Sequence, residues 1–173
     1  MYLQQAIEHG PDNPDSHARL AVNLAVRGRH DEASRAIAST LQLAPLDEEV
    51  RIAAGSVHRL AGRYEDALRE FDEAARLGYQ APDLAAERVR CLRLLQRFDE
   101  ALSAVERALE ADPDSGMLHY ERALVNIARG GDPAQIVKDF RIARGVLGAT
   151  EPGRPRPEPG LRAPAIPAIA PPR

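Results

Sequence analysis

The sequence has one cysteine, no tryptophan, four tyrosines and three phenylalanines among 173 residues. The single cysteine, Cys91, excludes an intramolecular disulfide and a cysteine-rich zinc site, so the fold does not depend on an oxidising compartment. So few aromatic residues, in a chain rich in alanine, leucine, arginine and glutamate, favour helices over strands. The expected fold class is therefore all-α.

Long apolar runs and blocks of like charge are also missing. No stretch approaches the roughly 18 apolar residues of a membrane helix, which argues against membrane insertion. The first ten residues lack a basic start followed by an apolar stretch, so we expect no signal peptide and a cytoplasmic location. The 23 basic and 26 acidic residues are interspersed, and this pattern does not favour nucleic acid as a partner.

An internal repeat of 34 residues is the main feature of the sequence. Gly28, Gly62 and Gly130 fall in one register with Gln96. Further columns without gaps are His30, Tyr64 and Phe98; Ala33, Ala67 and Ala101; Ile37, Phe71 and Val105; and Pro45, Tyr79 and Pro113. Such regular recurrence predicts an array of similar units.

Each unit is predicted to consist of two helices. In the unit that begins after Asp47, that aspartate caps a helix over 48–60, Gly62 forms the turn, and a second helix covers 64–77. Gln96 stands where the other units have glycine, so we expect a positive φ there at a cost of about 1 kcal/mol. Three further pairs are predicted to combine an N-cap with a first-turn proline: Asn13 and Pro14, Asp112 and Pro113, and Asp132 and Pro133.

The column pattern resembles the tetratricopeptide repeat family. The matching positions in the second full unit are Ala54, Gly55, Gly62, Tyr64, Ala67, Phe71 and Ala74. Where the family often has tryptophan, this chain has His17, Arg51, Ala85 and His119. The resemblance implies a right-handed superhelix of antiparallel helix-turn-helix hairpins, an α-solenoid.

The expected organisation follows from the register. Residues 1–13 are expected to be the second helix of a truncated preceding repeat, and 14–148 to hold four repeats, at 14–47, 48–81, 82–115 and 116–148. Residues 149–173 contain many prolines and are expected to be a disordered or polyproline-like tail. The tail carries four arginines and two glutamates, which leaves the repeats at about −5 of the total charge of −3.

No catalytic or metal-binding pattern is present in the sequence. The five histidines, at 9, 17, 30, 58 and 119, include no pair four residues apart, and His17 and His119 recur as packing residues would. Cys91 is expected to pack as a small apolar side chain. Aspartate and glutamate recur with arginine at helical spacing, which indicates solvated faces. We therefore expect no enzyme activity and no cofactor.

In the family that the sequence resembles, the first helices line a concave groove that binds peptides or partner helices. By register the groove would be lined by Arg19, Val22, Val26, Ile52, Ser56, Arg59, Glu87, Arg90, Arg93, Tyr120, Leu124 and Ile127. The central arginines suggest an acidic, amphipathic partner, and Arg90→Glu with Arg93→Glu is expected to weaken its capture without unfolding the chain. The family's chaperone-tail carboxylate clamp is absent, because its places hold Ala18, Val22, Ala53, Asp83 and Glu87.

These observations predict a non-enzymatic scaffold or adaptor that binds a protein or peptide. Two alternatives remain open at this stage: a chaperone for a secreted protein, as in small bacterial secretion chaperones, and the interaction module of a larger enzyme. The predicted last helix carries Val137, Ile142 and Val146 besides its inward residues. We therefore expect homo-oligomers through uncapped repeat ends, or covering of that end by the tail residues Ile166 and Ile169.

Overall fold

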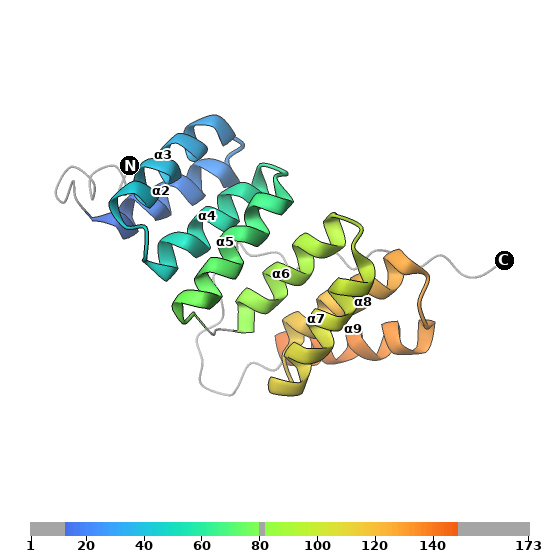
Figure 1. The fold of residues 1–173 in the computed structure, drawn as a ribbon. Coiled ribbons are helices and arrows are strands. Elements are labelled where there is room, and N and C mark those ends of the chain that lie inside the picture. The colour runs from blue at the N-terminus through green and yellow to red at the C-terminus, as the bar shows by residue number, and fades with distance from the viewer. Residues whose placement is uncertain (1–12, 80–81, 149–173) are drawn as a thin grey trace.

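The structure is a computed structural model that describes residues 13–79 and 82–148. All regular secondary structure in these ranges is helical, and Figure 1 shows the helices in sequence as four antiparallel pairs. The helices are α2 (Pro14–Val26), α3 (His30–Leu43), α4 (Glu48–Leu60), α5 (Tyr64–Leu77), α6 (Pro82–Leu94), α7 (Phe98–Ala111), α8 (Gly116–Arg129) and α9 (Pro133–Gly148).

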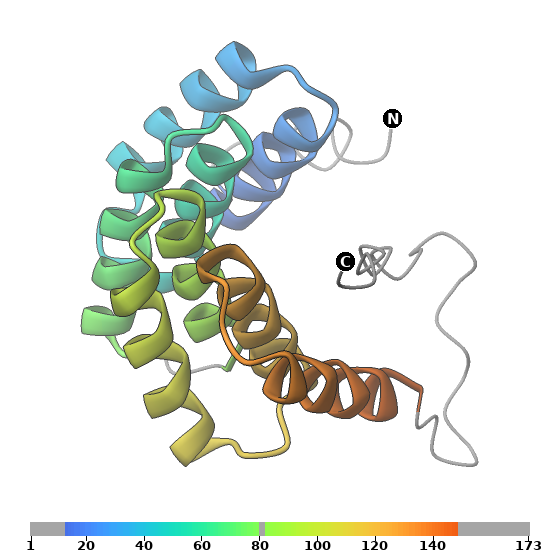
Figure 2. The same cartoon turned by 90° about the vertical axis from the view of Figure 1, so that its right-hand side faces the viewer.

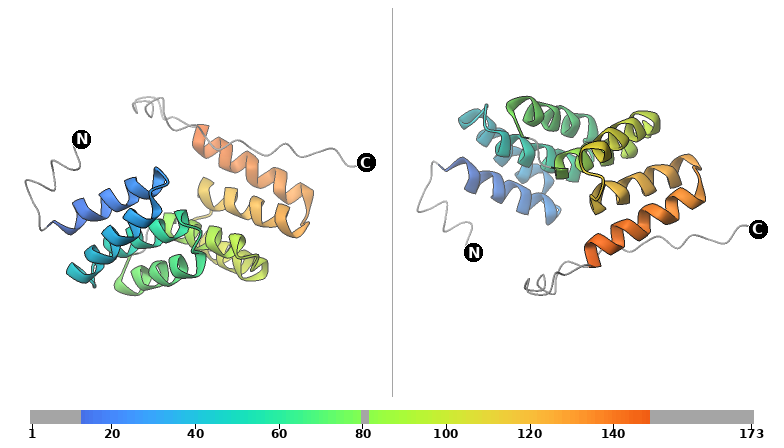
Figure 3. Two further views of the ribbon diagram at one scale, coloured as in Figure 1. Left: turned by 90° about the horizontal axis from the view of Figure 1, so that it is seen from above. Right: turned by 90° about the horizontal axis from the view of Figure 1, so that it is seen from below.

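The hairpins stack into a curved array with α2 and α8 on its inner side (Figure 2). The first helices of successive hairpins pack together in two places, α2 on α4 and α6 on α8, and each second helix packs on the first helix that follows it. The helices α4 and α6 do not pack closely, so α5 carries most of the connection between the two halves of the array. Figure 3 shows α2 and α9 at opposite ends.

Polar caps begin the helices as predicted at three places. The side chain of Asn13 accepts a hydrogen bond from the Asp15 amide, and that of Asp47 accepts one from the Val50 amide. The carboxylate of Asp132 accepts bonds from the first turn of α9. Each bond satisfies an amide that has no partner within its own helix.

The prediction that Asp112 caps a helix that begins with Pro113 is wrong. The helix α8 begins at Gly116 with Ser115 as its N-cap, so Pro113 lies in the preceding turn and not in the helix. The carbonyl of Pro113 lies 2.8 Å from Nε2 of His119, and this contact ties the turn to the first part of α8.

The turns within the hairpins follow the predicted register. Gly28, Gly62 and Gly130 have φ values of 78°, 77° and 73°, and Gln96 has a φ of 59°. A side chain in this left-handed region is strained because its Cβ crowds the following carbonyl. The positive φ predicted for Gln96 is confirmed.

The buried core joins the two helices of each hairpin. Ala67, Phe71 and Ala74 are fully buried on one face of α5, and the ring of Phe71 packs against the backbone of Gly55 in α4. Cys91 is also fully buried and belongs to the same apolar cluster as Phe71. Burial raises the pKa of the Cys91 thiol to about 12, as is typical of a cysteine that packs in an apolar core.

Two of the predicted segments fall largely or wholly outside the described residues: the second helix expected at 1–13 and the tail at 149–173. Among the helices within 13–79 and 82–148, none has the length and apolar character needed to cross a membrane. The same ranges contain no group of three or more histidine, cysteine, aspartate or glutamate side chains arranged to hold a metal ion.

Candidate partner-binding groove

A cavity of about 500 Å³ lies between α2 and α4, at the N-terminal end of the predicted groove. Its apolar wall consists of Ala18, Val22, Val26 and Ala53. Val26 is 68% exposed, so its side chain is open to solvent at the wall of this cavity. The polar lining residues are Asp15, Arg19, Asn23 and Glu49. We call this cavity the α2–α4 pocket.

The middle of the predicted groove is a network of ion pairs. Nε of Arg90 donates to Oε1 of Glu121 over 2.7 Å, and Arg93 lies 3.4 Å from the other oxygen of the same carboxylate. Arg90 also contacts Glu87 at 2.7 Å. Burial would lower the pKa of Arg90, but the two glutamates raise it. The arginines that we predicted to meet a partner are therefore already paired within the protein.

The same network crosses from α6 to α4. Nε of Arg59 lies 2.6 Å from Oε2 of Glu87, and both atoms lack a hydrogen-bond partner. The contact is therefore an ion pair without directed bonding. With three arginines and two glutamates, the network has a net charge of about +1 by direct count.

The prediction that acidic residues lie on solvated faces is wrong for Glu121. Its side chain is fully buried between α6 and α8. The repeat register gave no sign of this burial, since it compares equivalent positions and does not show which residues of neighbouring units meet. The pairing of Glu121 with Arg90 joins residues 31 apart in the chain.

At the C-terminal end of the predicted groove, the side chains lie against α9. Tyr120 and Leu124 pack against a small cluster that contains Ile136 and Phe140, and the rings of Tyr120 and Phe140 meet edge to face at 5.8 Å. Ile127 is 39% exposed. The two other predicted groove residues, Ile52 and Ser56 of α4, are partly buried. Ile52 packs against the apolar cluster that contains Phe71 and Cys91.

A second buried carboxylate, Asp139 of α9, was also expected at the surface and is fully buried. It accepts bonds from Arg122 at 2.9 and 2.6 Å and from Gln135 at 3.0 Å, and it lies 2.8 Å from Nδ1 of His119. Burial would raise the pKa of Asp139, but these three partners lower it below its usual value. The cluster ties α8 to α9 and so fixes the last hairpin.

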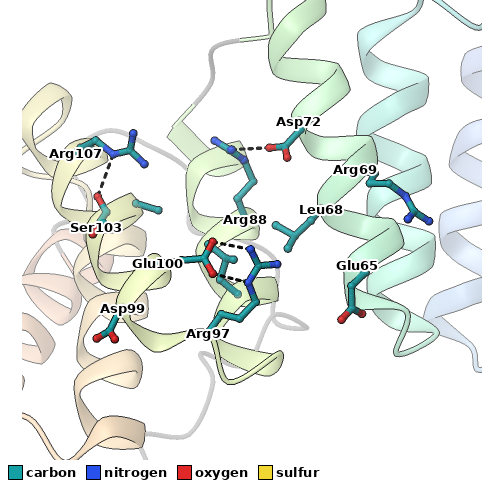
Figure 4. Close-up of a pocket in the computed structure, with 12 residues that line it drawn as sticks. Glu65, Leu68, Arg69, Asp72, Arg88, Arg97, Asp99, Glu100, Ser103 and Arg107 are labelled. Atoms are coloured by element: carbon teal, nitrogen blue, oxygen red, sulfur yellow. Dashed lines mark hydrogen bonds and ion pairs between the residues drawn. The ribbon is translucent and has the colours of Figure 1, made fainter.

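A second cavity, of about 600 Å³, lies on the outer side between α5 and α7 (Figure 4). Leu68 and Leu92 contribute its apolar part. Its walls are charged, and two ion pairs lie within them, between Arg88 and Asp72 at 2.5 Å and between Arg97 and Glu100 at 2.6 Å. The repeat register does not reveal this cavity, because residues of α5, α6 and α7 from two neighbouring units line it together.

Comparison with family models identifies the repeat. Models described as tetratricopeptide repeat match residues 52–116 and 95–145, and a further one matches 1–55. The chain belongs to the tetratricopeptide repeat family. Repeats of this family are generally non-enzymatic interaction modules.

Solved structures of tetratricopeptide repeat proteins share the fold. PilW, described as a widely conserved type IV pilus biogenesis factor, has a TM-score of 0.74 at 18% identity, over 86% of this chain and 69% of PilW. TTC0263, a thermophilic repeat protein of Thermus thermophilus, has a TM-score of 0.73 at 18% identity, over 86% and 81%. MamA from residue 41, of Desulfovibrio magneticus RS-1, has a TM-score of 0.69 at 16% identity, over 87% of this chain and 85% of MamA. Comparison with curated proteins gave no significant match. Identities this low establish only the fold, an all-α solenoid of repeats.

Proposed function

We propose that this protein is a non-enzymatic interaction scaffold that binds a peptide or a partner helix along the inner face of its array. The observation that carries the proposal is the α2–α4 pocket with the exposed side chain of Val26 at its wall. An apolar cavity with a polar rim suits the insertion of one aliphatic or aromatic side chain, and such anchors supply most of the affinity of an interface.

The charge pattern of the inner face suggests the rest of the partner. The ion-pair network of α4, α6 and α8 keeps a net charge of about +1, and its arginine side chains remain 20–25% exposed. We propose an amphipathic partner that places an apolar residue in the α2–α4 pocket and an acidic residue near Arg59 or Arg90. Because the arginines are already paired, the apolar anchor contributes more of the affinity than the charges do.

The test is a pair of variants that add the same side chain on opposite faces. Val26→Arg fills the pocket mouth, while Ala75→Arg changes an exposed position of α5 on the outer side. Each variant and the wild type are used as bait for affinity capture from the native host, followed by mass spectrometry and by direct titration of the captured protein. We expect Val26→Arg to lose the partner that wild type and Ala75→Arg both retain. Equal capture by all three would rule out binding at this pocket.

A further inference from the structure

In two hairpins, a carboxylate on the second helix is bound by an arginine of the first helix. Glu70 of α5 accepts a hydrogen bond from Arg51 of α4 over 2.7 Å. In the last hairpin, Asp139 of α9 accepts bonds from Arg122 of α8 at 2.9 and 2.6 Å. The third hairpin has Ala104 of α7 at this place, 34 residues after Glu70 and 35 residues before Asp139. It therefore lacks the carboxylate that the hairpins on both sides of it use.

The arginine of the third hairpin is nevertheless present. Arg88 of α6 lies 34 residues before Arg122, at the equivalent place of its unit. Its Nη2 lies 2.5 Å from Asp72 of the preceding helix α5, but its Nε is buried and has no hydrogen-bond partner. The side chains of Arg88 and Asp72 are 41% and 56% exposed, so their ion pair contributes little free energy, whereas the unpaired buried donor is unfavourable. Arg88 is thus incompletely paired.

A cavity is present where the carboxylate is missing. Ala104 and Arg88 both line the cavity of about 600 Å³ on the outer side, which we call the outer cavity (Figure 4). Leu68 and Leu92 also line it, and they are 8% and 9% exposed. The outer cavity therefore combines an apolar floor with the incompletely paired guanidinium group of Arg88.

Arg107 of α7 supplies a second guanidinium group to the outer cavity. Within residues 13–79 and 82–148 it makes one hydrogen bond, from Nε to the carbonyl of Ser103 over 3.2 Å, and no ion pair. Figure 4 shows the guanidinium groups of Arg107 and Arg88 near one edge of the cavity and the carboxylates of Glu65 and Asp99 near the other. One edge of the cavity therefore offers two arginines with unused donors.

The acidic edge of the outer cavity already has a basic partner. Arg97 donates to both oxygens of Glu100, at 2.7 and 2.6 Å. These hydrogen bonds raise the pKa of Arg97, and the nearby charge of Glu65 adds to the shift. The charge that the cavity lacks is therefore a negative one, at the edge formed by Arg88 and Arg107.

We propose that the outer cavity is a second interaction site, which receives a glutamate or aspartate of a partner protein together with a neighbouring leucine or isoleucine. The carboxylate accepts charge-assisted hydrogen bonds from Arg88 and Arg107, and so supplies to the third hairpin what its neighbours have within the chain. The apolar neighbour covers Leu68 and Leu92. The outer cavity lies on the other side of the array from the α2–α4 pocket, so both sites can be occupied at once.

The first test restores the missing carboxylate within the chain. Ala104→Glu places it where α5 has Glu70, and Ala104→Gln is the matched control of the same size without charge. We expect a higher urea midpoint for Ala104→Glu than for Ala104→Gln, and we expect the difference to disappear when Arg88→Gln is added to both. Equal midpoints in the presence of Arg88 would show that this place does not bind a carboxylate and would overturn the proposal.

The second test uses two capped tripeptides, leucine–glutamate–leucine and leucine–glutamine–leucine, and follows the methyl resonances of the full chain. The resonances of Leu68 and Leu92 should shift, with an affinity at least about three-fold higher for the glutamate peptide. Arg88→Gln with Arg107→Gln should remove this preference. Arg69→Gln is the matched control, because Arg69 lines the same cavity but pairs with Asp66 of its own helix. Circular dichroism checks that each variant is folded.

Each other result would overturn the proposal. Equal affinity for the two peptides would show that no carboxylate is recognised, and shifts at Val26 alone would place the peptide in the α2–α4 pocket. Equal shifts with sodium propionate at the same concentration would reduce the site to one for a free carboxylate. Shifts of Leu68 and Leu92 with protein concentration alone would identify a second copy of the chain as the occupant. The capture experiment on Val26→Arg does not depend on these results.

Discussion

The ring of Phe71 fills the space that a side chain on Gly55 would need. A Cβ atom on Gly55 would overlap the edge of that ring and would lie 2.8 Å even from its Cζ, closer than real contacts allow. We therefore predict that Gly55→Ala destabilises the protein by about 1–3 kcal/mol, although alanine is the better helix former. Urea unfolding followed by circular dichroism measures the change in the free energy of unfolding.

A second variant shows whether the clash is the cause. Phe71→Leu makes a smaller side chain and should itself be destabilising, but the loss caused by Gly55→Ala should shrink in its presence. The double-mutant cycle is expected to give a coupling of at least about 0.5 kcal/mol. Strict additivity would mean that the ring does not limit the space at Gly55.

We predict that Gln96→Gly stabilises the protein by about 1 kcal/mol. The φ of 59° at Gln96 strains a residue with a Cβ, whereas glycine adopts this conformation freely. The reverse change at the equivalent turn, Gly62→Ala, should cost a similar amount, because an added Cβ there meets nothing within 4 Å and only the backbone strain is tested. Urea midpoints of the two variants should move in opposite directions; a lower midpoint for Gln96→Gly would contradict the strain argument.

The hairpins, most of their caps and the strained turn at Gln96 could be predicted because each repeats at a fixed interval. The burial of Glu121 and Asp139 could not be predicted in this way. Glu121 is buried where it pairs with Arg90 and Arg93 of the preceding unit, and Asp139 where it pairs with Arg122 and His119 of the other helix of its own hairpin. Asp139 falls 35 residues after Ala104, so the repeat pattern offered no charged counterpart in the preceding unit. The α2–α4 pocket could be predicted only in part. The register predicted that Arg19, Val22 and Val26 line this end of the groove, but it did not predict the shape of the pocket.

Asp139 makes stability depend on pH. Its pKa is lower in the folded protein than the usual 3.8, so the stability that it contributes is fully present above about pH 4 and is lost as the pH falls through the folded pKa. We predict that Asp139→Asn costs about 3–5 kcal/mol at neutral pH, because the partly buried Arg122 and the buried His119 lose their charged partner. Urea unfolding from about pH 7 down to about pH 3 should show the wild type losing more stability than the variant. Parallel pH profiles would assign the acid sensitivity to other groups.

The pairing of Arg90 with Glu121 changes how the inner face should be probed. Arg90→Glu with Arg93→Glu would bring four carboxylates together, the two new ones with Glu87 and the fully buried Glu121. We therefore predict a loss of about 3–5 kcal/mol in stability, in contrast to the expectation drawn from the sequence. The control is the triple variant Arg90→Leu, Arg93→Leu and Glu121→Leu. It removes every charge of this part of the network and should recover most of the lost stability, because apolar side chains can replace a buried ion network at little cost. Thermal and urea unfolding of both variants tests this prediction, and a fully stable charge-reversed variant would contradict it. Weakened partner capture by that variant would then reflect unfolding, whereas Val26→Arg changes an exposed side chain and separates binding from stability.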